Sequence, residues 1–203
     1  SRSLTRFANN TIHQNVTEES AEVTIAALVG KRMGVAATGS TRPGDLRRCA
    51  RQAVTLAKLT PENPDFKSLP GPKPYEQVST WFEATAACTP IQRAEAIRGF
   101  TDRANRLGLT LAGALSTGDG EMAVANTLGV RAYQSLTAAD LNIVAHAGDS
   151  SGYAFGLHRD LGRLDLDALA DRAMERCAAS RNPRDIAPGR YTVVLEPPAG
   201  AGN

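Results

Sequence analysis

The chain has 203 residues, of which 42% are hydrophobic and 22% are charged, and its formal net charge is +2. These values are ordinary for a globular protein, and scattered basic residues balanced by acidic ones indicate no preference for nucleic acid or a charged membrane surface. No run of about 18 apolar residues occurs, so the sequence predicts no membrane-spanning helix.

The chain opens with a polar segment, residues 4–15, that we expect to form a strand. It holds more hydrogen-bonding groups than a core strand can satisfy, among them the side chains of Arg6, Asn9, Asn10, His13 and Gln14. An edge strand with one face in water explains this composition. The alternative is that these side chains bind a peptide or a partner subunit, because amides can hydrogen-bond an extended backbone and an edge strand can accept another strand.

A β-hairpin and a helix are predicted next. Residues 22–29 and 32–38 alternate with strand period around a two-residue loop at Gly30. Asp45 is a candidate N-cap for a helix that ends before Thr60. One apolar stripe at helical spacing defines its inner face: Leu46, Cys49, Ala50, Ala53, Val54 and Ala57.

A proline-rich connection at residues 61–74 leads to a second helix. Thr89 is a candidate N-cap, Pro90 suits the first helical position, and Gly108 suits the left-handed position after the last turn. We expect its inner face to consist of Ile91, Ala94, Ile97, Thr101, Ala104 and Leu107.

The remainder is predicted to be an antiparallel meander followed by a third helix at 166–179 and a closing strand at 191–195. The meander comprises five short strands, with turns at 118–120 and 126–129: residues 109–116, 121–125, 130–136, 140–146 and 152–158.

The predicted elements define an α+β fold, an antiparallel sheet with helices packed on one face. Adding 120 to the first helix's stripe gives Leu166, Leu169, Ala170, Ala173, Met174 and Cys177 of the last helix. Two explanations of this similarity between the apolar stripes of the two helices stay open. Any two amphipathic helices share such a template, or the chain contains two hairpin–helix units about a common sheet.

Few residue patterns in the sequence indicate a metal-binding, redox or nucleic-acid-binding site. The three histidines show no zinc-binding spacing, although His146 and His158 could lie on adjacent strands. Three cysteines at wide spacings form no disulfide framework, so we expect a reducing, cytoplasmic compartment. Arg47, Arg51 and Lys58 share a face of the first helix and could follow phosphates, but no nucleic-acid-binding motif accompanies them.

The chain resembles the N-terminal domain of the TldD/PmbA family, bacterial and archaeal proteins long called modulators of DNA gyrase. The segments that carry the resemblance are 6–15, 34–38, 61–65, 126–129, 152–154 and 188–197, together with the helix after Gly44 and Asp45. The resemblance implies one α+β domain over residues 1–196, with the connection 61–74 inside it. It further implies that the tail 197–203 leads to a C-terminal domain absent here.

In that family the TldD-type subunit binds a catalytic metal through an HExxxH motif and a later cysteine in its C-terminal domain. The PmbA-type (TldE) subunit lacks these ligands and pairs with it. No position here matches the ligands, so the resemblance implies neither a catalytic residue nor a cofactor in this chain. Zinc or another divalent metal would be bound in the C-terminal domain of the full-length protein.

The expected function is that of a peptidase subunit's N-terminal domain, which contributes to enclosing a peptide substrate and to subunit pairing. Its partners would be a peptide and, in a homodimer or heterodimer, a TldD/PmbA-type subunit. The first alternative is a non-enzymatic interaction module, as in a PmbA-type partner subunit. The second is nucleic-acid binding through the first helix.

Overall fold

The computed structural model describes residues 1–196, which form two compact units. The first consists of Ser1–Thr17, Val78–Glu121 and residues 134–196, and the second of Glu18–Gln77 and Met122–Tyr133. The single N-terminal domain expected over residues 1–196 stays a prediction, and the expected tail lies outside the described residues.

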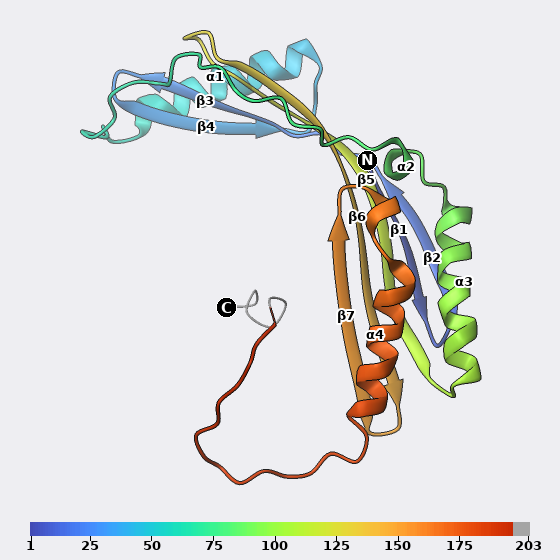
Figure 1. Ribbon diagram of the computed structural model, residues 1–203. Helices are drawn as coiled ribbons and strands as arrows, with labels where there is room; N and C mark the ends of the chain where they lie inside the picture. The colour runs from blue at the N-terminus through green and yellow to red at the C-terminus, as the bar shows by residue number, and fades with distance from the viewer. Residues whose placement is uncertain (197–203) are drawn as a thin grey trace. The chain divides into compact units, whose positions relative to one another are not determined.

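The first unit is built on a five-stranded sheet of order β2-β1-β5-β6-β7 (Figure 1). The pairs β1–β5 and β6–β7 are antiparallel. The strands are β1 (Arg2–Ala8), β2 (Thr11–Glu18), β5 (Thr110–Ala125), β6 (Arg131–Ala147) and β7 (Ser150–His158). The last residues of β5 and the first residues of β6, within Met122–Tyr133, belong to the second unit.

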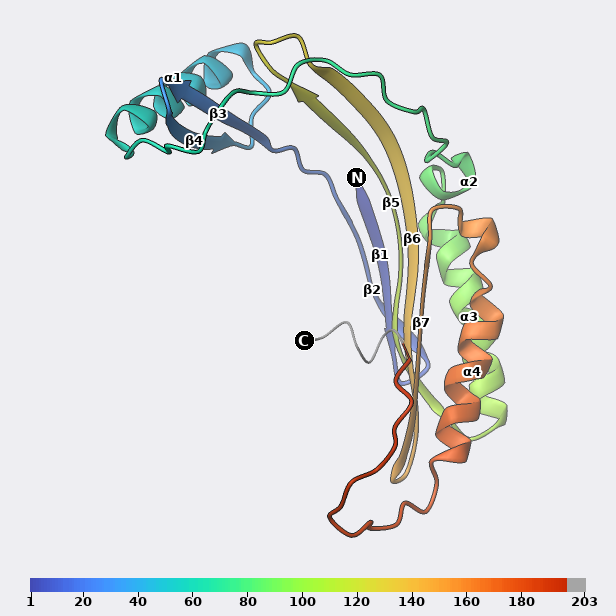
Figure 2. The ribbon, with the colours of Figure 1, turned by 60° about the vertical axis from the view of Figure 1, so that its left-hand side comes forward.

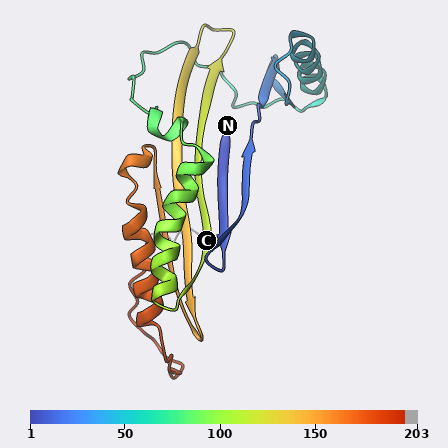
Figure 3. The same cartoon turned by 90° about the vertical axis from the view of Figure 1, so that its right-hand side faces the viewer.

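Two helices, α3 (Pro90–Arg106) and α4 (Leu166–Ala179), lie side by side on one face of this sheet (Figures 2 and 3). Two short helical segments, α2 (Glu83–Ala86) and η1 (Leu161–Arg163), contact each other. Within residues 1–196 no helix of this unit covers the opposite face. The expected α+β class is confirmed, and no helix in the described part of the chain is long and apolar enough to cross a membrane.

The core of the first unit lies between the sheet and the two helices. The rings of Phe7 on β1 and Phe100 on α3 meet with centroids 5.6 Å apart, and both side chains are buried. Ile97, Leu141 and Ile143 are also fully buried in this cluster. Burial of each such side chain contributes roughly 1.5–3 kcal/mol, so this layer holds the unit together.

The second unit contains the two-stranded sheet of β3 (Val23–Val29) and β4 (Arg32–Thr38), covered by α1 (Pro43–Leu59). The hairpin is confirmed, and Gly30 adopts the positive φ of 62° that its turn requires. The buried side chains between hairpin and helix are small: Ala36, Cys49 and Ala53.

Close helix–strand contact at a glycine recurs in both units. A Cβ added to Gly34 would lie 2.2 Å from the backbone of α1, and one added to Gly152 would lie 2.1 Å from the backbone of α4. The chain therefore contains two hairpin–helix units, β3–β4–α1 and β6–β7–α4. They are built on separate sheets, however, not on a common one.

The predicted helix ends are confirmed where a capping residue lies directly at the end of the helix. The hydroxyl of Thr89 accepts from the Gln92 amide, and the Gln92 side chain accepts from the Thr89 amide, which forms a capping box. Gly108 has a φ of 65°. The helix expected at 166–179 occupies those residues, with Asp165 as its N-cap.

Two predictions about helices were wrong. Asp45 does not cap α1, because Pro43 already occupies the first helical position and Arg42 precedes it. Asp45 lies in the first turn, where a hydrogen bond from Ser40 lowers the pKa of its carboxyl. On α3 the expected inner face was shifted, since Ile91 is 70% exposed and Arg93 is buried.

The strands differ from expectation in three places. The opening segment is a hairpin of β1 and β2 and not one strand. The four short strands expected between 109 and 146 are two long ones, β5 and β6. The expected turn at 118–120 does not form, since β1 pairs with β5 as far as Gly118 and the Asp119 amide donates to the Ser1 carbonyl. Residues 191–195 form no strand, because no strand in the described part of the chain pairs with them.

Candidate functional site

The polar opening segment turns back on itself at Asn9 and Asn10. These residues have φ angles of 50° and 58°, as a two-residue hairpin turn with positive φ at both central positions requires. Asparagine tolerates this conformation better than other residues with a side chain. Part of the asparagine-rich composition is therefore explained by the turn.

Asn10 is the best-connected residue of the segment. Its Nδ2 donates to Oδ1 of Asn105 at 2.6 Å and to the carbonyl of Leu109 at 2.8 Å. Its Oδ1 accepts from the amide of Leu111 at 2.6 Å. The side chain thus ties the hairpin to the end of α3 and the start of β5, which is a structural role.

The other four predicted residues lie at the surface. Arg6 donates to Gln14 at 3.3 Å across the hairpin, whereas Asn9 and His13 are exposed. The structure therefore brings Arg6 and Gln14 together but does not gather all five side chains into one site. Contact of these residues with a peptide or partner stays a prediction.

Replacing Asn10 with alanine is expected to lower the free energy of unfolding by about 2 kcal/mol. The change leaves a part-buried amide and carbonyl without their partner and puts alanine at a positive φ. Urea denaturation of the Asn10→Ala variant measures this loss. Gln14→Ala, which removes one exposed 3.3 Å hydrogen bond, is the control and should stay within about 0.5 kcal/mol of wild type. Equal stability of both variants would contradict the structural role.

The face of the five-stranded sheet without helices, here named the open face, can be defined from the strand pairing. Arg6 alternates with the buried Phe7 and so belongs to this face, as does its cross-strand partner Ala114. β5 contributes small residues, namely Ala112, Ala114, Ser116, Gly118 and Gly120. β6 and β7 contribute larger ones, in the opposed pairs Asp140–Leu157, Asn142–Phe155 and Val144–Tyr153.

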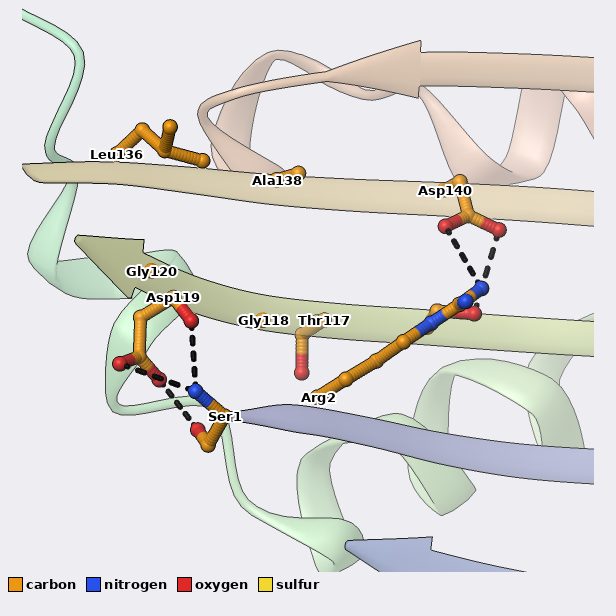
Figure 4. A pocket seen from close by; sticks show the side chains of 10 residues that line it. Ser1, Arg2, Thr117, Gly118, Asp119, Gly120, Leu136, Ala138 and Asp140 are labelled. Atoms are coloured by element: carbon orange, nitrogen blue, oxygen red, sulfur yellow. Dashed lines mark hydrogen bonds and ion pairs between the residues drawn. The ribbon is translucent and has the colours of Figure 1, made fainter. Parts of the chain in front are cut away.

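A pocket of about 380 Å³ lies at the β1–β5–β6 part of the open face (Figure 4). Asp140 is its polar centre: it accepts from Ser116 Oγ at 3.2 Å and lies 3.9 Å from the Arg2 guanidinium. The pocket was not predicted from the sequence, because residues 118–120, which line it, were expected to form a turn and not part of a strand. The pocket exists because Gly118 lies within a strand opposite Arg2.

The remaining candidates do not form sites together. His146 pairs with Ser151 and His158 with Ala139, so the two histidines lie at opposite ends of the β6–β7 pair. Among residues 1–196, no three histidine, cysteine or acidic side chains gather as metal ligands would. Arg47, Arg51 and Lys58 are exposed on α1.

Two family models match the chain. The "PmbA/TldA metallopeptidase domain 1" matches residues 1–57, and the "PmbA/TldA metallopeptidase central domain" matches residues 81–181. No match was found among proteins with curated functions.

Solved structures share the fold. TldE from Thermococcus kodakarensis matches with a TM-score of 0.74 and 24% identity over 87% of this chain and 42% of its own. A proposed modulator of a DNA gyrase from Thermotoga maritima gives 0.75 and 17% over 93% and 44%, and one from Bacteroides thetaiotaomicron gives 0.75 and 13% over 91% and 45%. The chain spans less than half the length of each. With both family models and the shared fold, the chain belongs to the PmbA/TldD family.

Proposed function

We propose that this chain is the N-terminal part of a TldD/PmbA-type peptidase subunit, which helps to enclose a peptide substrate and to pair subunits. The open face carries the first part of this proposal. It presents Tyr153, Phe155 and Leu157 of β7, each 39% exposed or more, and, across β6, the small side chains of β5. An uncovered sheet face of this kind is typical of an interaction site.

The second unit supports the pairing role. Its hairpin packs one face on α1, while the opposite face carries Met33 and Val35, which are 52% and 47% exposed. Their cross-strand neighbours, Leu28 and Ala26, extend the same apolar face. We propose this hairpin face as a contact for a homodimeric or heterodimeric partner subunit.

The rest of the proposal concerns the parent protein. A zinc or other divalent ion would be bound in its C-terminal domain, and this chain would shape the space in which the peptide lies. Three free cysteines, two of them buried, support a reducing cytoplasmic location.

Photo-crosslinking of the intact protein tests both roles. A photoreactive residue at Asn142 on the open face is expected to crosslink an added unfolded peptide, and one at Met33 is expected to crosslink a second subunit. Matched controls are exposed helix positions, Arg172 on α4 and Gln52 on α1. Equal peptide labelling from Asn142 and Arg172 would refute enclosure, and equal subunit labelling from Met33 and Gln52 would refute pairing.

A further inference from the structure

The edge strand β7 is partly covered by side chains of α4. The Ser151 amide donates to Ser180 Oγ at 3.2 Å, and that hydroxyl lies 2.8 Å from the Ser151 carbonyl. Arg176 Nη1 donates to the Tyr153 carbonyl at 2.9 Å. The outward-facing backbone at the first half of this edge is therefore satisfied within the unit.

Among residues 1–196, no strand pairs with the second half of the edge. Outward-facing backbone groups recur at every second residue of a strand, so those of Phe155 and Leu157 point the same way as those of Ser151 and Tyr153. The described part of the chain supplies no hydrogen bond to Phe155 or Leu157 on that side. An unpaired stretch of this kind accepts an additional strand.

This free stretch ends at a cavity with cationic walls. The cavity has a volume of about 550 Å³ and is lined by Leu157 itself, the apolar side chains of Phe82 and Leu136, and the two arginines Arg159 and Arg163. Among the described residues, no acidic side chain lines it. The Asp160 carboxylate, on the residue after Arg159, lies 3.9 Å from Arg163 and accepts from the Gly162 amide. Positive charge therefore exceeds negative charge at this end of β7.

The backbone beside the cavity is fixed by buried hydroxyls. The Arg159 carbonyl accepts from Thr85 at 3.0 Å and from Thr137 at 2.8 Å, and both threonines are fully buried. The Asp160 amide donates to Nδ1 of His158 at 2.9 Å. A site held in place before a ligand arrives loses less entropy on binding.

We propose that this end of β7 binds the C-terminal end of an extended peptide. The peptide backbone pairs in parallel with Phe155 and Leu157, its last side chain lies against Leu136 and Phe82, and its terminal carboxylate faces Arg159 and Arg163. Charge-assisted hydrogen bonds from guanidinium groups to a carboxylate are among the stronger polar contacts in proteins. The inference rests on the proposed peptide-enclosing function and names the part of the peptide that is recognised.

Fluorescence anisotropy with the intact protein tests the carboxylate. The probe is an unstructured alanine-rich octapeptide that ends in leucine and is labelled at its N-terminus, made with a free C-terminus and with a C-terminal amide. We expect the free acid to bind about tenfold more tightly than the amide. In the Arg159→Gln/Arg163→Gln double variant the two peptides should bind equally. Arg172→Gln, at an exposed arginine outside the cavity, should keep the difference.

The free edge is tested separately. Phe155→Pro removes an outward-facing amide but leaves the pairing with β6 intact, because that amide points away from β6. Phe155→Ala removes the same side chain and keeps the amide. The proposal predicts weaker binding of the free acid to the proline variant than to the alanine variant, at equal melting temperature.

The outcomes separate this site from the proposed function. Equal binding of acid and amide to the wild type overturns the carboxylate site while leaving peptide binding in place. Peptide crosslinking from Asn142 without any effect of the arginine or proline substitutions likewise overturns this site alone. Absence of both crosslinking and anisotropy binding overturns both proposals.

Discussion

The Gly152→Ala variant is expected to lose about 3 kcal/mol of unfolding free energy. The added Cβ would lie 2.1 Å from the Ala173 carbonyl oxygen and 2.4 Å from the Cys177 amide nitrogen. Both are backbone atoms of α4, so no side chain can rotate away and the helix itself must move. Ala173 and Cys177 are completely buried, and their displacement opens the core between α4 and the sheet.

Gly99→Ala is the matched control for this prediction. It makes the same chemical change within α3, where an added Cβ meets nothing within 4 Å. Because alanine favours the helix over glycine, Gly99→Ala should raise stability by up to about 1 kcal/mol. Urea denaturation of both variants measures the difference in sign. A Gly152→Ala variant as stable as wild type would show that α4 does not approach β7 this closely.

The sequence could predict those parts of the fold that depend on nearby residues, but not those that depend on distant ones. Helix ends at Thr89 and Gly108 and the turn at Gly30 were predictable, because the signal lies within a few residues of the feature. The length of β5 was not, since 118–120 has turn composition. Pairing with β1, about 115 residues earlier in the chain, keeps it extended.

The candidate sites likewise depend on contacts between residues that are distant in the sequence. The polar hairpin was visible in the sequence, but the role of Asn10 depends on Leu109 and Leu111, about 100 residues away. The cavity at the end of β7 depends on Thr85 and Thr137, which fix the Arg159 carbonyl from two other segments. No periodicity within one element reports such contacts.

Arg93 shows most clearly what a periodic pattern cannot predict. It lies on α3 next to the apolar stripe, yet it is 1% exposed and takes part in none of the ion pairs formed among residues 1–196. Its Nε donates to Thr5 on β1 at 3.0 Å, and its Nη1 donates to Thr117 on β5 at 3.1 Å and to the Cys88 carbonyl at 2.9 Å. The guanidinium thus joins a helix, two strands and the turn before the helix.

Arg93→Ala is therefore expected to cost about 3 kcal/mol or more of unfolding free energy. The substitution opens a cavity and leaves the buried hydroxyls of Thr5 and Thr117 without their donor. Arg93→Lys should fall between wild type and alanine, because an ammonium cannot reproduce the forked geometry of three hydrogen bonds. Arg98→Ala, on the exposed side of the same helix, should change stability by less than about 0.5 kcal/mol.

Arg93→Met distinguishes the contributions of packing and hydrogen bonding. Methionine fills much of the same volume without a charge, so it avoids the cost of burying a cation that has no carboxylate partner. If hydrogen bonds to Thr5, Thr117 and Cys88 outweigh that cost, Arg93→Met is clearly less stable than wild type in urea. A methionine variant at least as stable as wild type would mean that the side chain acts through its volume. The three hydrogen bonds would then offset only the desolvation of the guanidinium.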